Sequence, residues 1–205
     1  FSKTFSKTVS PDLLTTYVNV SVTKQDEKKV NSKIEDFNKY IKNNNIVDVK
    51  DGKYTLSPRY KYVNKKQIFT GYLGSLRYKI ESNNAKDLNS FIEKLINLKD
   101  KVDNNDVKLN VSNINWTISS TLYNNNLDTL RIDTIIWINE YAKNLSTKLS
   151  KKCEVKNINI SSVSNRNIYY AREAMVSSAK VASDVTPASN DENITINPNF
   201  VLECK

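Results

Sequence analysis

The stretch Tyr17-Val18-Asn19-Val20-Ser21-Val22-Thr23 decides the fold class, together with the segment that follows it. Its valines alternate with polar residues, which is the period of a strand with one buried face. The period then changes, because apolar residues recur at helical spacing at Val30, Ile34, Phe37 and Ile41. A helix is therefore predicted directly after the strand, and the capping-box-like pair Thr23 and Asp26 marks its start.

Strand and helix patterns mix irregularly along the rest of the chain. Further strands are predicted at residues 4–9, 54–62, 67–81, 114–118, 155–162 and 194–204. A second helix follows the capping residue Asn84, and a third covers about residues 127–150. The buried face of the third helix is expected to carry Leu130, Ile135, Ile138, Tyr141, Ala142, Leu145 and Leu149. Because strict βαβ alternation is missing, we predict an α+β fold of antiparallel sheets with three main helices packed on one face.

Two absences exclude most common enzyme classes. The chain contains no histidine, so His-based acid–base catalysis, Ser-His-Asp or Cys-His activation and His-ligated zinc are excluded. Its three glycines, Gly52, Gly71 and Gly74, form neither a phosphate-binding loop nor a dinucleotide fingerprint. The carboxylates show no paired spacing for acid–base work or a metal site. We therefore expect a protein that is not an enzyme and has no catalytic, cofactor-binding or metal-binding residues.

The first residues of the sequence and its apolar runs bear on export and membrane insertion. The sequence begins Phe1-Ser2-Lys3, without an initiator methionine, and its one methionine is Met175. A removed secretory leader is the simpler explanation. No apolar run reaches the roughly 18–20 residues that a membrane-spanning helix needs, so no transmembrane segment is expected.

The net charge of +9 is concentrated in the first half of the chain. The densest cluster contains Lys53, Arg59, Lys61, Lys65 and Lys66. Such a cluster is typical of a surface for polyanions, but a lysine-rich composition also simply keeps a protein soluble. The tyrosines interleaved with these bases could stack on a ligand or could form an interface with another protein. Both interpretations remain open from sequence.

Cys153 and Cys204 are the two cysteines of the chain. One precedes a predicted strand and the other ends the last strand, so antiparallel pairing of these strands would place them in reach of a disulfide. An even cysteine count in an exported protein favours this. The alternative is a redox-active thiol pair, activated by the nearby Lys151, Lys152 and Lys205.

Four stretches resemble a known family in the right order along the chain. They are Pro11-Asp12 with the strand after it, Leu56-Ser57-Pro58-Arg59-Tyr60-Lys61-Tyr62, Thr70-Gly71-Tyr72 and Asn113-Ile114-Asn115-Trp116-Thr117-Ile118. Together they resemble the SIMPL-domain family, bacterial envelope proteins often labelled oxidative-stress-defence or periplasmic immunogenic proteins. Departures from the family pattern are a less alanine-rich third helix and Cys153, where a glycine is common.

The resemblance implies a single SIMPL-like domain over residues 1–205, in a periplasmic location. We expect two intimately packed α/β-sandwich lobes, with lobe one at about 5–66 plus 192–204, lobe two at about 67–163 and a long loop at 164–191. The resemblance also implies a homo-oligomer. It supplies no catalytic residues and no cofactor, and an envelope location makes nucleic acid an unexpected partner.

Two further candidate sites lie at the end of the expected long loop and within it. Asp191-Glu192-Asn193-Ile194-Thr195 fits an acidic sequon for glycosylation at Asn193, although a chance match is common in so asparagine-rich a chain. A segment that could serve as an assembly arm carries Tyr169, Tyr170, Arg172, Met175 and Pro187. Tyrosine gives large contact area at low entropic cost, and the alternative is a loop without function.

These observations favour a non-catalytic, self-assembling envelope protein with a protective or scaffolding role, linked by resemblance to oxidative-stress defence. The alternative is a basic module that binds an anionic envelope component. A thiol-dependent antioxidant is the third possibility.

Overall fold

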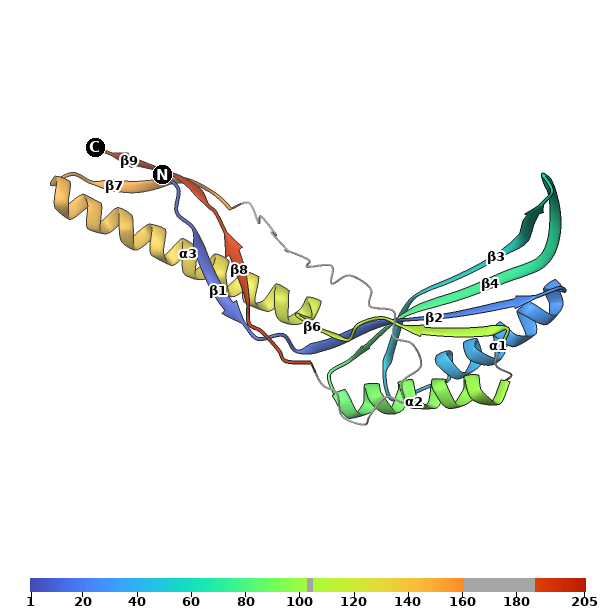
Figure 1. Ribbon diagram of the computed structural model, residues 1–205. Coiled ribbons are helices and arrows are strands. Elements are labelled where there is room, and N and C mark those ends of the chain that lie inside the picture. Colours follow the sequence, from blue (N-terminus) through green and yellow to red (C-terminus); the bar gives the residue numbers. More distant parts are fainter. Residues whose placement is uncertain (103–104, 161–186) are drawn as a thin grey trace. The chain divides into compact units, whose positions relative to one another are not determined.

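The computed structural model describes residues 1–102, 105–160 and 187–205, which fall into two units (Figure 1). Among these residues, unit 1 contains 1–12, 118–160 and 189–205, and unit 2 contains 13–117 and 187–188. This division differs from the expected lobes, one of which ended at residue 66. A boundary at that position would cut a hairpin whose strands pair from Val63↔Lys66 to Arg59↔Gly71, with one register shift between Tyr60 and Arg59, so the hairpin stays within one unit.

Unit 2 is built on an antiparallel sheet around β2 (Leu13–Lys24). The strand order is β3-β4-β2-β5, with β3 at Asp48–Val63, β4 at Lys66–Ser82 and β5 at Val107–Val111. The short strand β6 (Asn115–Thr117) pairs with the first residues of β2.

Helices α1 (Glu27–Lys42) and α2 (Ala85–Val102) cover one face of this sheet (Figure 1). The predicted caps are partly confirmed. Asp26 is the N-cap of α1 and its carboxylate accepts a hydrogen bond from the Lys29 N–H at 3.2 Å, while the Asn84 side chain accepts one from the Lys86 N–H at 2.9 Å. Thr23 lies within β2. The core between the layers contains Val18, Val20, Val22, Val30, Ile34, Phe37, Ile41, Leu76, Ile80, Leu88, Phe91 and Leu95.

Unit 1 consists of the long helix α3 (Ser120–Leu149) and two two-stranded antiparallel sheets that pack along it. One sheet pairs β1 (Phe5–Val9) with β8 (Glu192–Ile196), and the other pairs β7 (Cys153–Asn159) with β9 (Asn199–Cys204). The buried cluster contains Val9, Leu127, Leu130, Ile194 and Ile196. A cluster of aromatic rings joins Phe1, Phe5, Trp137, Tyr141 and Phe200.

The predicted α+β class with three helices and antiparallel sheets is confirmed. Some element bounds differ. The single final strand predicted at 194–204 is two strands, because Pro198 has no N–H for a ladder and separates β8 from β9. β5 was not predicted at all. Within the described residues, no helix is long and apolar enough to cross a membrane.

Candidate functional surfaces

Helix α3 has apolar side chains on two faces. Its buried face carries Leu127, Leu130, Thr134, Ile138 and Ala142. On the exposed side, Ile132, Ile135 and Ile136 are 58%, 41% and 52% exposed. Residues separated by three and four positions are neighbours on a helix surface, so the three side chains form one apolar surface. We call Ile132, Ile135 and Ile136 the isoleucine patch.

The exposure of this patch corrects the sequence prediction for α3. Ile135 and Leu149 were expected on the buried face, but the structure exposes both. The buried position next to Ile135 is held by Thr134, which is fully buried. The helix has more isoleucines than its buried face can hold, and this excess is the sequence signal for an exposed apolar patch. The signal was missed because Thr134 is polar and yet faces inward.

The end of the β3–β4 hairpin extends beyond the rest of the unit 2 sheet (Figure 1). β2 pairs with β4 only as far as Lys24↔Tyr72, so residues 59–71 pair with one another and with no third described strand. We call residues 59–71 the free ribbon. It begins at Gly71, whose φ of +115° lies in the region that favours glycine. A side chain there would also collide with the carbonyl oxygen of Lys24.

The free ribbon ends in a tight turn and carries exposed aromatic rings. Asn64 and Lys65 have φ angles of 50° and 62°, as a two-residue type I′ hairpin turn requires. Tyr60 lies opposite Phe69, with ring centroids 5.8 Å apart and the planes nearly perpendicular. The ring centroid of Phe69 in turn lies 5.3 Å from that of Tyr72. These T-shaped contacts are the favoured geometry of aromatic pairs and order the ribbon without covering it.

The predicted polyanion residues lie on this hairpin. Arg59, Lys61, Lys65 and Lys66 belong to the free ribbon, and Lys53 lies farther back on β3. The Arg59 guanidinium donates a hydrogen bond to the Thr23 hydroxyl at 3.4 Å. No aspartate or glutamate occurs from residue 52 to residue 80. The structure therefore brings these bases together with the exposed tyrosines in a segment without acidic side chains.

Glu81 is the acidic residue that ends this segment, and it is almost buried. Its side chain is 5% exposed and forms ion pairs with Lys50 and with Lys79, the latter at 2.6 Å. Burial raises the pKa of Glu81, but the hydrogen bonds and charges of the two lysines outweigh it and hold the pKa below its usual value. The Glu81 hydrogen bond likewise raises the pKa of Lys50.

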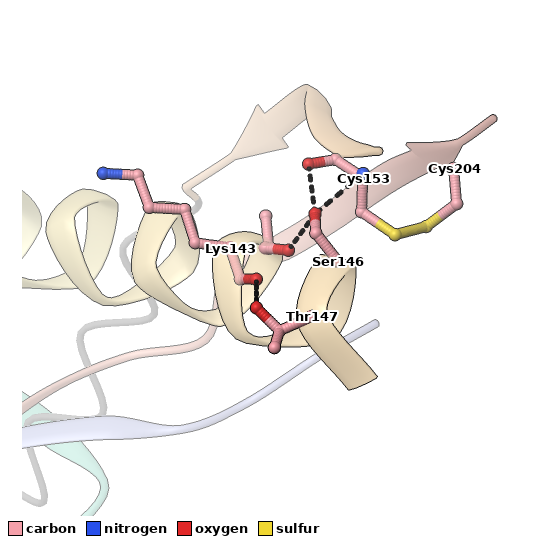
Figure 2. Close-up of a disulfide and its surroundings, with 6 residues drawn as sticks. Lys143, Ser146, Thr147, Cys153 and Cys204 are labelled. Atoms are coloured by element: carbon pink, nitrogen blue, oxygen red, sulfur yellow. Dashed lines mark hydrogen bonds between the residues drawn. A yellow bond between two sulfur atoms is a disulfide. The ribbon is translucent and has the colours of Figure 1, made fainter. Parts of the chain in front are cut away.

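The predicted disulfide between Cys153 and Cys204 is present, and the two residues lie opposite each other in the β7–β9 ladder. Figure 2 shows how this end of the ladder is joined to α3. The Ser146 hydroxyl accepts a hydrogen bond from the Cys153 N–H at 2.8 Å and lies 2.9 Å and 3.2 Å from the carbonyl oxygens of Ala142 and Cys153. The disulfide therefore fixes the last turns of α3 and the ends of two strands together.

Two of the three lysines near the disulfide, Lys152 and Lys205, have acidic neighbours. The Lys152 ammonium lies 2.6 Å from the Glu154 carboxylate, and the Lys205 ammonium lies 3.8 Å from that of Glu203. The Glu154 hydrogen bond raises the pKa of Lys152, and Lys152 lowers the pKa of Glu154. A positive charge close to a thiol lowers the pKa of that thiol, but carboxylates offset the charges of Lys152 and Lys205. These surroundings favour a structural disulfide over a reactive pair.

Comparison with known proteins gives the family of the chain. The model of the SIMPL family, described as a protein of unknown function (DUF541), matches residues 3–200. The chain belongs to the SIMPL family. None of the curated proteins matches it. Among solved structures, the de novo designed protein Foldit4 is 16% identical, covers 49% of this chain and 97% of its own, and has a TM-score of 0.30.

The stretches that carried the family resemblance have structural roles in this SIMPL chain. Asp12 accepts hydrogen bonds from the backbone N–H and the hydroxyl of Ser119, the N-cap of α3, both at 2.7 Å. The stretch 56–62 forms the outer half of β3, and the stretch 70–72 contains the bend at Gly71. No role was predicted for Asp12, because a contact across more than a hundred residues leaves no local signal.

The remaining candidate residues of the SIMPL chain are only partly described. Asn193 lies within β8, not in a loop, and its side-chain oxygen accepts a hydrogen bond from the Thr8 hydroxyl at 2.9 Å. The carbonyl oxygen of Pro187 accepts a hydrogen bond from the Trp116 indole at 2.8 Å. Tyr169, Tyr170, Arg172 and Met175 of the expected arm lie outside the described residues.

Proposed function

We propose that this SIMPL chain is a non-catalytic, self-assembling protein of the bacterial periplasm with a protective or scaffolding role. The observation that carries the proposal is the isoleucine patch on α3. Contiguous apolar surface on an exposed helix face is typical of a site that another protein covers. A second copy of the chain presents the same patch, and two such helices can pack with their isoleucines interdigitated.

The contrast with the other two helices supports this interpretation. The large apolar side chains of α1 and α2 are buried or half-buried, whereas those of α3 include four that are more than 40% exposed: Ile132, Ile135, Ile136 and Leu149. Composition alone does not explain the difference, because the same asparagine- and lysine-rich sequence builds all three helices. Transfer of the three patch isoleucines out of water would contribute about 1.5–3 kcal/mol for each side chain that becomes fully buried.

The test is the molar mass in solution, measured by light scattering after size exclusion. The wild-type chain is expected to elute as a multiple of 23.5 kDa that is unchanged by reductant, because its disulfide lies within one chain. Ile135→Lys should shift the mass toward the monomer. Asn144→Lys adds the same charge on an exposed position of the same helix and should leave the mass unchanged. A wild-type monomer at all concentrations would refute assembly.

The periplasmic location and the link to oxidative stress belong to the same proposal. A disulfide within the folded chain supports export, since disulfides persist in oxidising compartments. Cell fractionation of the natural full-length product tests the location. If the protective role depends on assembly, cells that carry only the Ile135→Lys chain should be as sensitive to peroxide as cells without the protein, while Asn144→Lys should restore survival.

A second candidate function is a basic module that binds an anionic envelope component. It is supported by the acid-free segment from residue 52 to residue 80, which contains Lys53, Arg59, Lys61, Lys65, Lys66, Arg77 and Lys79. Binding through such a surface weakens steeply as salt screens the charges. Immobilised polyphosphate is a suitable probe. Retention that does not change with salt would exclude this function.

A further inference from the structure

The free ribbon, residues 59–71, combines three properties that no other described surface of the chain shares. It projects beyond the sheet as two strands held only by each other, it exposes large apolar side chains, and it is basic without any acidic residue. We propose that the tip of the free ribbon inserts into the headgroup region of an anionic lipid bilayer. This inference deepens the second candidate function, on which it rests, and is independent of self-assembly.

The distribution of apolar side chains over the ribbon argues for a bilayer as the partner. Tyr62, Tyr60 and Phe69 are 75%, 51% and 43% exposed, and Ile68 and Val63 are 43% and 40% exposed. Opposite residues of an antiparallel ladder point to the same face, so Tyr60 and Phe69 share one face while Ile68 lies on the other with Lys61. A protein partner would cover one face. Apolar groups on both faces suit a medium that surrounds the tip.

The charges and the side-chain types also fit the headgroup region. Tyrosine prefers the membrane–water interface, because its ring is apolar and its hydroxyl is polar. Lysine can lay its methylene chain along apolar surface while its ammonium reaches a phosphate. Lys61, Lys65 and Lys66 lie within a few residues of Tyr62 and Val63. Each lysine near an anionic surface contributes about 1 kcal/mol, so the bases attract the tip and the apolar residues then enter.

The backbone prepares the tip for this role. The type I′ turn at Asn64-Lys65 keeps the two strands paired up to Val63↔Lys66, so the backbone groups that face the other strand have ladder partners right up to the turn. The outward-facing N–H and C=O groups of the two free edges need other partners, and the headgroup region, unlike the hydrocarbon core, supplies water and phosphate oxygens to them. The bend at Gly71 sets the direction in which the ribbon leaves the sheet.

The experiment measures binding of the whole chain to sedimented vesicles. Vesicles of phosphatidylcholine mixed with phosphatidylglycerol in equal parts should bind the protein, and vesicles of phosphatidylcholine alone should bind it far more weakly. The double variant Lys65→Gln/Lys66→Gln should bind the anionic vesicles about thirty-fold more weakly, as loss of two lysine contacts requires. The matched control Lys28→Gln/Lys29→Gln removes the same charge from the exposed start of α1 and should bind like the wild type.

Insertion itself needs a separate readout. Tyr62→Trp places an indole at the tip, and spin-labelled lipid should quench its emission well beyond any quenching of the native Trp116 and Trp137. Tyr62→Ser/Val63→Ser should weaken vesicle binding while binding to soluble polyphosphate is unchanged. Polyphosphate binding without vesicle binding would overturn the bilayer inference and leave the basic module standing. Failure of both probes would overturn both, and equal binding to neutral and anionic vesicles would also overturn the inference.

Discussion

The carboxylate of Asp12 accepts two hydrogen bonds from Ser119, one from its backbone N–H and one from its hydroxyl, each 2.7 Å long. Ser119 is itself the N-cap of α3, and its hydroxyl oxygen accepts a hydrogen bond from the Leu122 N–H at 3.1 Å. Asp12 thus orients the capping residue and places a negative charge at the positive end of the helix dipole. The first turn of α3 contains no acidic residue of its own, so this charge comes from a distant segment.

Replacement of Asp12 should destabilise unit 1. Asp12→Ala removes both hydrogen bonds to Ser119 and is expected to lower the free energy of unfolding by about 1–2 kcal/mol. Denaturant titration followed by circular dichroism measures the change. Asp133→Ala removes an exposed aspartate from the middle of the same helix and should have little effect. Equal effects of the two substitutions would contradict a capping role.

The buried Glu81 predicts a stability that depends on pH in the acidic range. The pKa of Glu81 is lowered in the folded chain, so its stabilising effect is full above the pKa of an unfolded glutamate, near 4.3, and is lost as the pH falls through the lower folded value. Glu81→Gln should therefore be less stable than the wild type at pH 7, by about 1–3 kcal/mol. The difference should shrink below about pH 4. A gap that stays constant from pH 7 to pH 3 would rule out this titration.

Gly71 should tolerate no side chain. Gly71→Ala forces a residue with a Cβ into φ +115° and against the Lys24 carbonyl oxygen, which together should cost about 1–3 kcal/mol or more. Thermal unfolding compared with Thr70→Ala, the neighbouring substitution without a backbone demand, isolates the effect. If Gly71→Ala melts with the wild type, the bend does not depend on glycine.

The disulfide should act on stability more than on chemistry. Cys153→Ser/Cys204→Ser opens a loop of 51 residues and should lower the free energy of unfolding by up to about 4 kcal/mol in the chain-entropy model. The Cys153 N–H donates a hydrogen bond to the Ser146 hydroxyl of α3, so the disulfide-linked strand ends are joined to this helix. The loss of stability should therefore appear first in unit 1. Peroxide consumption by the wild-type chain with a thiol reductant, abolished in the double variant, would instead support the antioxidant alternative.

Sequence patterns predicted those elements whose apolar period is continuous. The valines of β2 and the stripe of α1 were found because alternation and helical spacing are local properties. β5 was missed because Val107, Leu109 and Val111 form a strand of only five residues beside a polar stretch. α3 was predicted to begin at residue 127, since most residues of Ser120–Asn126 are poor helix formers, but the cap at Ser119 and its bond to Asp12 extend the helix to Ser120.

For the candidate surfaces too, local patterns could be predicted from the sequence, whereas contacts made in three dimensions could not. The Cys153–Cys204 pairing could be predicted from two strand ends, and the bases of residues 53–66 could be read directly. Which apolar residues stay exposed could not, because exposure depends on what a face packs against in three dimensions. Tyr60 and Tyr62 were consistent with a buried or interface face until the register showed that β2 ends at Lys24 and leaves them uncovered.

The pairing of β1 with β8 joins Phe5 to Ile196, so β1 finds its partner only after the long stretch of chain between the two strands has been synthesised. Residues 13–117, which build the sheet of unit 2, emerge without interruption and can close their core first. Until Glu192–Cys204 arrive, β1 and the apolar face of α3 have no ladder to join. Until residues 192–196 are synthesised, β1 is therefore an unpaired strand, and an unpaired strand edge is a site where one chain can pair wrongly with another.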